Sequence, residues 1–376
     1  MPKAPLPANT LPPMLELLLG FSLSVLISFL VIRYDHKHAH LLSDHDMSGP
    51  QKFHAKVVPR VGGIGIVAGV IGALLASWVG HRDSSVLGML LIACAAPAFL
   101  AGLAEDLTKS QSPRRRLFFT VVSAGLAAWL LGAVIRRTDI PGLDWLVSFG
   151  FSAVLVTMFA VAGVANAVNI IDGFNGLAAM CVVMMLAAIA YVAFQAHDVP
   201  IVMCALAGLG AVLGFFVWNF PAGLIFLGDG GAYFLGFYVA ELSILLLHRN
   251  AIVSPLFPLL MCIYPIFETV FSMYRRRFVR GRPMGLPDGV HLHSLIYRRL
   301  IRWAVGSKSA KALTKRNSMT APYLWLLCMF SVVPAVVFWD NSALLGIFIV
   351  LFGATYVFLY SRIVRFKAPA WLITRR

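Results

Sequence analysis

Eleven apolar segments, each close to the length of a membrane-spanning helix, follow one another along this chain and leave little of it for any other fold. The segments are 14–32, 61–79, 86–104, 117–135, 146–164, 176–194, 201–218, 231–247, 251–273, 321–338 and 342–361. A helix needs ~20 apolar residues to cross the hydrocarbon core of a bilayer. We therefore predict an all-α, polytopic integral membrane protein with about eleven transmembrane helices, forming a single domain over residues 1–376.

The lysine and arginine residues set the orientation of the predicted helices. If the loop 33–60 is cytoplasmic and the segments alternate, the cytoplasmic loops 33–60, 105–116 and 274–320 and the C-terminal tail hold 26 of the 31 basic residues. Positive charge concentrates on the cytoplasmic side of membrane proteins, so we predict a periplasmic N-terminus and a cytoplasmic C-terminus. The same distribution explains the net charge of +15, and no nucleic-acid partner is expected.

The acidic residues that stand in motif-like settings all fall on this predicted cytoplasmic side. Glu105 and Asp106 end the third apolar segment, in the stretch AGLAEDLTKS. The C-terminal end of a helix is the negative end of its dipole, so two carboxylates there cost stability and suggest a compensating cation. The alternative is a solvated helix end beside Lys109.

A second polar element, NAVNIIDGFNGL, links the fifth and sixth segments at residues 166–177. Asn166, Asn169, Asp172 and Asn175 recur every three residues, so on a helical turn they would share one face. Polar groups wedged between two apolar helices need partners, which favours a functional site. Asp-Gly and Asn-Gly are also ordinary turn dipeptides, and a plain turn is the alternative.

Asp229 lies between glycines in LGDGG, where the eighth segment begins. Glycine lets the backbone approach a ligand closely, and the N-terminus of the following helix offers a binding place for a phosphate. A simple Gly-Asp-Gly turn is the competing interpretation.

Two histidines and one intramembrane acid complete the candidate groups. His291 and His293 lie in the long basic loop and share a side only if the segment is extended; they suit either diphosphate recognition or an ordinary cytoplasmic loop. Glu268, in the ninth segment, is read either as a wall of a cytoplasmic site or as the partner of a polar helix neighbour.

The glycine run VGGIGIVAGVIG at 61–72 superficially suggests a nucleotide-binding loop. Its spacing does not fit GxGxxG and no strand precedes it. We interpret the run as close helix packing through small residues.

Taken in order, these segments resemble the polyprenyl-phosphate N-acetylhexosamine-1-phosphate transferases, which form glycosyltransferase family 4. The family pattern is an acidic pair followed by xxK, then NxxNxxDG, FxGDxG and HxH. Its counterparts here are Glu105–Asp106 with Lys109, 166–173, 226–230 and 291–293, and the stretch 49–63 is similar to the family's first inner loop.

Three positions depart from the family pattern. Glu105 stands where Asp is usual, Asn175 where a second Asp is common, and Ser294 where some members have another His. These departures argue against the peptidoglycan branch of the family. The chain is more similar to the members that initiate O-antigen synthesis.

The resemblance implies transfer of N-acetylhexosamine 1-phosphate from a UDP-sugar to undecaprenyl phosphate, giving undecaprenyl-diphospho-sugar and UMP. It places this reaction on the cytoplasmic face of the bacterial inner membrane, as the first membrane step of O-antigen or a related cell-envelope polysaccharide. The identity of the N-acetylhexosamine stays open. Some family members form dimers, so a homodimer is kept open too.

The resemblance also implies the site. The expected cytoplasmic active-site loops are 33–60, 105–116, 165–175, 219–230 and 274–320. The expected catalytic residues are Glu105, Asp106, Asp172, Asp229 and His291, with Glu105 and Asp106 orienting the lipid phosphate or acting as base. The expected substrate-binding residues are Lys52, His54, Lys109, Arg116, Asn166, Asn169, Asn175, Asn219 and His293. Asp229 and Asp172 are the expected ligands of Mg²⁺, with Mn²⁺ as an alternative ion, because Mg²⁺ prefers one or two carboxylates and substrate phosphates.

The main rival interpretation is a secondary transporter that uses intramembrane acids for ion coupling. Transporters hold their substrates near the bilayer midplane, often between repeated halves. Here the acids gather at one face and the sequence has no visible repeat. A membrane scaffold without catalytic activity is a third interpretation, but it gives no reason for acids at an unfavourable helix end.

Overall fold

The computed structural model describes residues 14–42, 58–78, 80–279, 281, 289–301 and 310–365, with the side chains of 35–42 and 310–311 excepted. Over these residues the chain is all-helical and has no β-strand. The first helices are α1 (Met14–Leu42), α2 (Gly62–Ala76), α3 (Arg82–Thr108), α4 (Pro113–Leu130), α5 (Leu143–Ser148), α6 (Gly150–Ile171), α7 (Leu177–Gln195) and α8 (Val199–Asn219). They are followed by α9 (Gly228–Arg249), α10 (Leu256–Met261), α11 (Ile263–Tyr274), α12 (Leu292–Ile296), α14 (Ala310–Ser318), α15 (Ala321–Val337) and α16 (Ser342–Val364), with π-helical turns at Arg275–Val279 and Tyr297–Ile301.

Eight helices of the described part are long and apolar enough to cross a membrane: α1, α3, α6, α7, α8, α9, α15 with most of α14, and α16. The prediction of a multi-pass, all-helical membrane protein is therefore confirmed. The count of eleven spans and the orientation of the termini stay predictions. The apolar helix α2 has 15 residues, and α4 carries three arginines in its first turn.

Three predicted segments differ from the helices that form. The fifth segment, 146–164, is broken at Phe149 into α5 and α6. The first helix runs to Leu42, ten residues beyond the predicted segment, so part of the expected loop 33–60 is helical. The ninth segment is broken at Cys262 into α10 and α11. Pro258 and Pro265 flank this break, and a proline removes a backbone hydrogen bond inside a helix.

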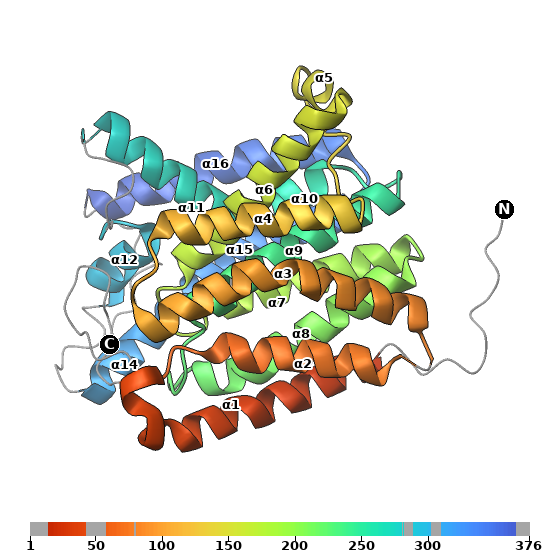
Figure 1. Ribbon diagram of the computed structural model, residues 1–376. Coiled ribbons are helices and arrows are strands. Elements are labelled where there is room, and N and C mark those ends of the chain that lie inside the picture. Colours follow the sequence, from red (N-terminus) through yellow and green to blue (C-terminus); the bar gives the residue numbers. More distant parts are fainter. Residues whose placement is uncertain are drawn as a thin grey trace.

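Helix α9 is the centre of the bundle (Figure 1). It packs against α3, α6, α2 and α7, and 94% of its most apolar 18-residue stretch is buried. A Cβ atom on Gly63 would lie 2.5 Å from Cα of Gly231, and one on Gly102 would lie 2.6 Å from Cα of Gly230. A Cβ on Gly65 would lie 2.6 Å from Oγ of Ser28. The interpretation of glycines 63 and 65 as helix-packing residues is confirmed, because these contacts leave no room for side chains.

Candidate active site

Asp106 binds the first turn of α9. It is 3% exposed, and its Oδ1 and Oδ2 accept hydrogen bonds of 2.9 Å each from the backbone N–H groups of Asp229 and Gly230. It lies one helical turn after Gly102, where α3 and α9 are in close contact, so the glycine contact brings the carboxylate to the helix end. The positive end of the α9 dipole thus compensates an acid placed at the negative end of α3.

This contact corrects one expectation about Asp229. The amides of Asp229 and Gly230 are bonded by Asp106 in this structure, so they are not open to a phosphate. The glycine before them serves close packing within the protein: Gly228 has a φ of +76°, and a Cβ there would lie 2.0 Å from the carbonyl oxygen of Arg60 and 2.6 Å from Oδ2 of Asp106.

Arg60 is the site residue that the sequence reasoning missed. Its segment pairs with the approach to α9: Phe226 donates its N–H to the carbonyl oxygen of Pro59 (2.9 Å), and Gly62 donates to Phe226 (3.0 Å). The positive charge of Arg60 acts on both Asp106 and Asp172. Its position in the family-like stretch 49–63 was the signal that could have identified it.

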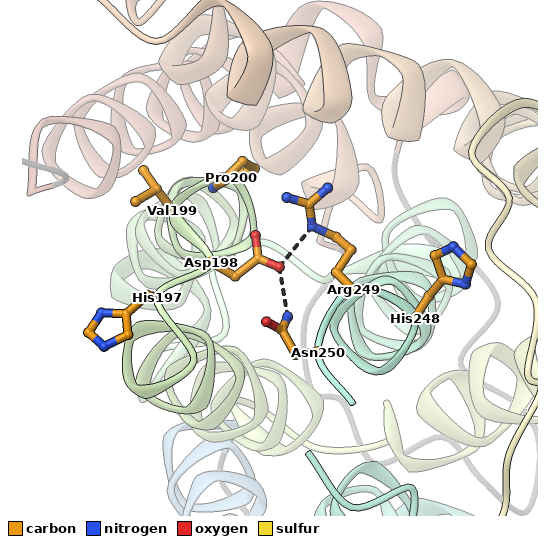
Figure 2. Close-up of a pocket in the computed structure, with 7 residues that line it drawn as sticks. All are labelled: His197, Asp198, Val199, Pro200, His248, Arg249 and Asn250. Carbon is orange, nitrogen blue, oxygen red and sulfur yellow. Dashed lines mark hydrogen bonds and ion pairs between the residues drawn. The ribbon is translucent and has the colours of Figure 1, made fainter. Parts of the chain in front are cut away.

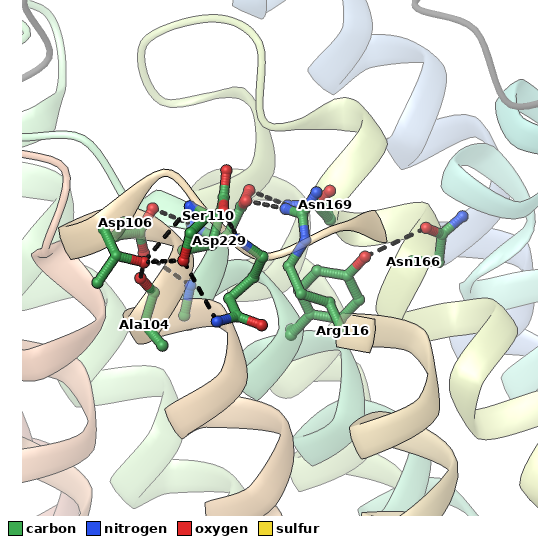
Figure 3. Close-up of polar contacts among 12 residues, drawn as sticks. Ala104, Asp106, Ser110, Arg116, Asn166, Asn169 and Asp229 are labelled. Atoms are coloured by element: carbon green, nitrogen blue, oxygen red, sulfur yellow. Dashed lines mark hydrogen bonds and ion pairs between the residues drawn. The ribbon is translucent and has the colours of Figure 1, made fainter. Parts of the chain in front are cut away.

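Both carboxylate oxygens of Asp229 are bonded to side chains from other helices (Figure 3). Arg116, in the first turn of α4, forms an ion pair with Oδ2. Asn169, near the end of α6, donates from Nδ2 to Oδ1 at 2.7 Å. The Arg116 guanidinium also lies 5.8 Å from the centre of the Tyr233 ring, and the hydroxyl of Tyr233 contacts Oδ1 of Asn166 at 3.4 Å.

Asp172 is the C-cap residue that directly follows α6. Burial raises the pKa of its carboxyl to about 7, and the charge of Arg60 acts in the opposite direction. The negative charge of Asp172 also acts on Asp106. Acids from α3, α6 and α9 therefore meet at one end of the bundle, together with the cations Arg60 and Arg116.

The expected polar stripe along 166–175 is only partly helical. Asn166 and Asn169 lie on α6, but the helix ends before Asp172, and Asn175 lies in the following turn. The backbone N–H of Asn175 donates to Oδ1 of Asn317 at 2.8 Å, and its Nδ2 donates to the hydroxyl of Ser318 at 3.1 Å. The Asp-Gly and Asn-Gly turns end the helical repeat, so the four residues do not share one helix face.

The other predicted binding residues have these places. Asn219 holds the same turn, accepting from the N–H of Gly176 at 2.6 Å and donating to the carbonyl of Ile225 at 2.7 Å. Lys109 is exposed and has a φ of +55° at the end of α3. Its positive charge acts on Asp106. Lys52 and His54 lie outside the described residues. Substrate contacts by all of these residues stay predictions.

Glu105 differs from its neighbour Asp106. It is half-buried, and its Oε2 accepts the backbone N–H of Gln111 at 2.6 Å. This bond closes the loop that follows α3. The two members of the acidic pair therefore bind different parts of the protein.

The two histidines are both buried and lie together. The rings of His291 and His293 stack with their centres 5.0 Å apart and an angle of 12° between them. Nδ1 of His291 lies 2.9 Å from Oε1 of Glu268. Of the two roles considered for Glu268, the structure therefore supports the polar partnership, and the partner is His291.

The donor chemistry of the site suits Mg²⁺ without forming a closed cage. Within the described residues, no group of three or more His, Cys, Asp or Glu side chains is arranged to hold a metal ion. Two carboxylates are enough for Mg²⁺, which takes its remaining ligands from water and substrate phosphates. Arg116 and Asn169 already bond both oxygens of Asp229. A metal ion would therefore fit there once Arg116 turns from Asp229 to the substrate phosphates.

A cavity of about 670 Å³ lies at the opposite end of α9 and is separate from these acids. It is lined by His197, Asp198, Val199, Pro200, His248, Arg249 and Asn250. Oδ2 of Asp198 accepts hydrogen bonds of 2.8 Å from Arg249 and from Asn250, and the two histidines lie on opposite sides of this group (Figure 2). The cavity is therefore a different place from the candidate active site.

The comparison with known families covers the centre of this site. The profile described as glycosyl transferase family 4 matches residues 86–247, the stretch that holds Asp106, Asp172 and Asp229. This match and the relatives below support the family that the motifs indicate. The residues that the profile spans run from α3 to α9, so they include the ends of α3, α4, α6 and α9 that form the site.

Three relatives extend the match beyond these residues. A probable undecaprenyl-phosphate N-acetylglucosaminyl 1-phosphate transferase of Bacillus subtilis is 27% identical over 284 residues, covering 74% of this chain and 77% of the relative. An undecaprenyl-phosphate alpha-N-acetylglucosaminyl 1-phosphate transferase of Yersinia pestis is 25% identical, covering 67% and 69%. A phospho-N-acetylmuramoyl-pentapeptide-transferase of a Geobacillus species is 29% identical, covering 61% and 74%.

Proposed function

We propose that this protein transfers N-acetylhexosamine 1-phosphate from a UDP-sugar to undecaprenyl phosphate, forming undecaprenyl-diphospho-sugar and UMP. The observation that carries the proposal is the meeting of Asp106, Asp172 and Asp229 with Arg60 and Arg116 at one end of the helix bundle. The names of the relatives support the acceptor and the sugar-phosphate chemistry.

In the proposed reaction an oxygen of the lipid phosphate forms a bond to the sugar-linked phosphorus of the UDP-sugar. The bond from that phosphorus to the bridging oxygen breaks, and its electron pair leaves with UMP. The second pKa of a phosphate monoester is ~6, so the acceptor is already mostly dianionic at pH 7. The site therefore needs to offset charge and position the two phosphates more than it needs a base.

The cations and acids of the site divide this work. Arg116 and Arg60 attract the phosphates, and Asn169 holds the orientation of Asp229. Asp229 and Asp172 would hold Mg²⁺, which when bound supplies neutralisation of the diphosphate charge. Asp106 acts by positioning, because its two oxygens fix the first turn of α9 and hence the backbone that carries Asp229.

The proposed setting is the cytoplasmic face of the bacterial inner membrane. The Lys and Arg distribution supports that side, and helices apolar enough to cross a membrane suit an acceptor that is embedded in the bilayer. The proposed product feeds O-antigen or a related cell-envelope polysaccharide, and the N-acetylhexosamine is proposed as a class.

Purified protein in nanodiscs, given undecaprenyl phosphate and radiolabelled UDP-N-acetylglucosamine, tests the proposal. We expect Mg²⁺-dependent transfer of label into the lipid fraction and release of one UMP per labelled lipid. A panel of UDP-N-acetylhexosamines then identifies the sugar. If folded protein transfers label from none of them, the proposal is wrong, and an ion-coupled transport assay in liposomes then examines the rival interpretation.

A further inference from the structure

A buried carboxylate outside the family-like motifs is bonded to two distant segments of the chain, the histidine segment and the last helix. Glu268, on α11, is 1% exposed. Its Oε1 accepts the backbone N–H of Leu292 at 3.0 Å and lies 2.9 Å from Nδ1 of His291. Its Oε2 accepts the hydroxyl of Tyr356, from α16, at 2.8 Å. Both oxygens are therefore bonded, one to the histidine segment and one to the last helix.

The contact with Glu268 selects one form of the His291 ring. A carboxylate can only accept hydrogen bonds, so the Nδ1 atom that faces it must carry the hydrogen. This assignment leaves Nε2 on the other edge of the ring, as an acceptor when the ring is neutral and as a donor when it is protonated.

The orientation of the ring is fixed from further sides. Its stacking partner His293 lies edge-on to Phe174, with ring centres 5.5 Å apart, and Phe174 follows Asp172 by two residues. The carbonyl of Val290 accepts a hydrogen bond of 2.5 Å from Arg275. The histidine pair is thus held between the Glu268 carboxylate and the turn that carries Asp172.

We propose that Glu268 is a positioning residue for His291 in the transfer reaction, holding the imidazole in the Nδ1–H form with Nε2 directed to the substrate phosphates. The inference rests on the proposed function. It also extends the site to α16, because Tyr356 binds the second oxygen of the same carboxylate.

A role limited to holding helices together explains the arrangement less well. A buried carboxylate in a membrane protein is costly, and well-packed apolar side chains usually hold buried contacts as well as an ionic group does. Groups that orient a functional histidine are commonly a carboxylate or a carbonyl on its other nitrogen. The position of Glu268 against Nδ1 matches that second arrangement.

Histidine-labelled full-length protein in nanodiscs gives a test that does not depend on turnover. Nitrogen NMR distinguishes a protonated Nδ1 from an unprotonated one, and loss of the signal in His291→Asn assigns it. We expect a protonated Nδ1 in the wild-type protein. An unprotonated Nδ1 would overturn the proposal, even if the proposed function is correct.

Kinetics test whether Glu268 acts through His291. We expect Glu268→Ala to lower kcat roughly 10- to 100-fold, as losses of orienting partners usually do, with a smaller loss in Glu268→Gln, which keeps an acceptor. Glu268→Ala combined with His291→Ala should be no slower than His291→Ala alone. If the two losses multiply, Glu268 acts independently and the proposal is wrong.

Glu241→Gln is the matched control. Glu241 is another fully buried acid, on α9, and neither of its carboxylate oxygens has a hydrogen-bond partner. We expect wild-type kcat from this variant. If wild-type protein shows no transferase activity at all, the proposed function fails, while the NMR measurement still decides the contact between Glu268 and His291.

Discussion

The carboxylate of Asp106 accepts a 2.9 Å hydrogen bond from the backbone N–H of Asp229, although the two residues are 123 positions apart in the chain. The acid from the end of α3 thereby serves as a cap for α9. This relationship assigns Asp106 to the support of the site, while the carboxylate of Asp229 is bonded to Arg116 and Asn169.

Replacing Asp106 with Asn should lower both stability and activity. The Asn side chain keeps one acceptor, but its NH2 group would face the N–H of Gly230 or Asp229, leaving a buried donor without a partner, at a cost of about 1–3 kcal/mol. Thermal unfolding in detergent, read beside transfer activity, measures both effects. Glu105→Gln is the control, since Gln still accepts the Gln111 N–H; equal melting temperatures for the two variants would contradict the capping role.

Replacing Asp229 with Asn should damage turnover more than replacing Glu105 with Gln. Asp229 is the proposed metal ligand and pairs with Arg116, whereas Glu105 bonds a loop amide. We expect a kcat loss of at least ~100-fold for Asp229→Asn, the order of electrostatic groups that act at a transition state. Steady-state kinetics at saturating Mg²⁺ measure it. Equal losses in both variants would count against this division of roles.

Replacing Gly228 with Ala should destabilise the approach to α9. The φ of +76° alone costs an L-residue about 1–2 kcal/mol, and the new Cβ would lie 2.0 Å from the carbonyl oxygen of Arg60. Gly163→Ala on α6 is the matched control, because a Cβ there meets nothing within 4 Å. The comparison is made by thermal unfolding, and an unchanged melting temperature for Gly228→Ala would be the contrary result.

Binding of Mg²⁺ should depend on pH and release a proton from Asp172. Burial raises the pKa of this carboxyl to about 7, so below pH 7 it is largely protonated and must lose its proton before it can bind a cation. We expect affinity to rise between pH 6 and pH 8 and then to level off. Titration calorimetry in two buffers of different ionisation enthalpy counts the protons.

The control for this experiment is Asp172→Asn. The variant should bind Mg²⁺ more weakly and without proton release in this pH range. Proton release that persists in Asp172→Asn would assign the titrating group to another residue.

Local patterns predicted most of the fold. Apolar runs of about twenty residues predicted the helices, and their bounds match α7 and α9 to within a few residues. The same patterns missed the break at Cys262, because a proline's effect depends on what neighbouring helices supply to the interrupted backbone. The helical stripe expected from 166 to 175 failed at Asp172, where turn chemistry outweighs the three-residue spacing.

The order of the motifs along the chain was enough to indicate the family and the chemical class of the site, because both depend on which residue types occur at short spacings. The partners within the site come from distant segments. Asp106 meets Asp229, Arg60 acts on Asp172, and Glu268 meets His291 only after close glycine contacts and helix packing bring α2, α3, α9, α11 and α16 together. Such contacts depend on the three-dimensional approach of helices, which short sequence spacings do not encode.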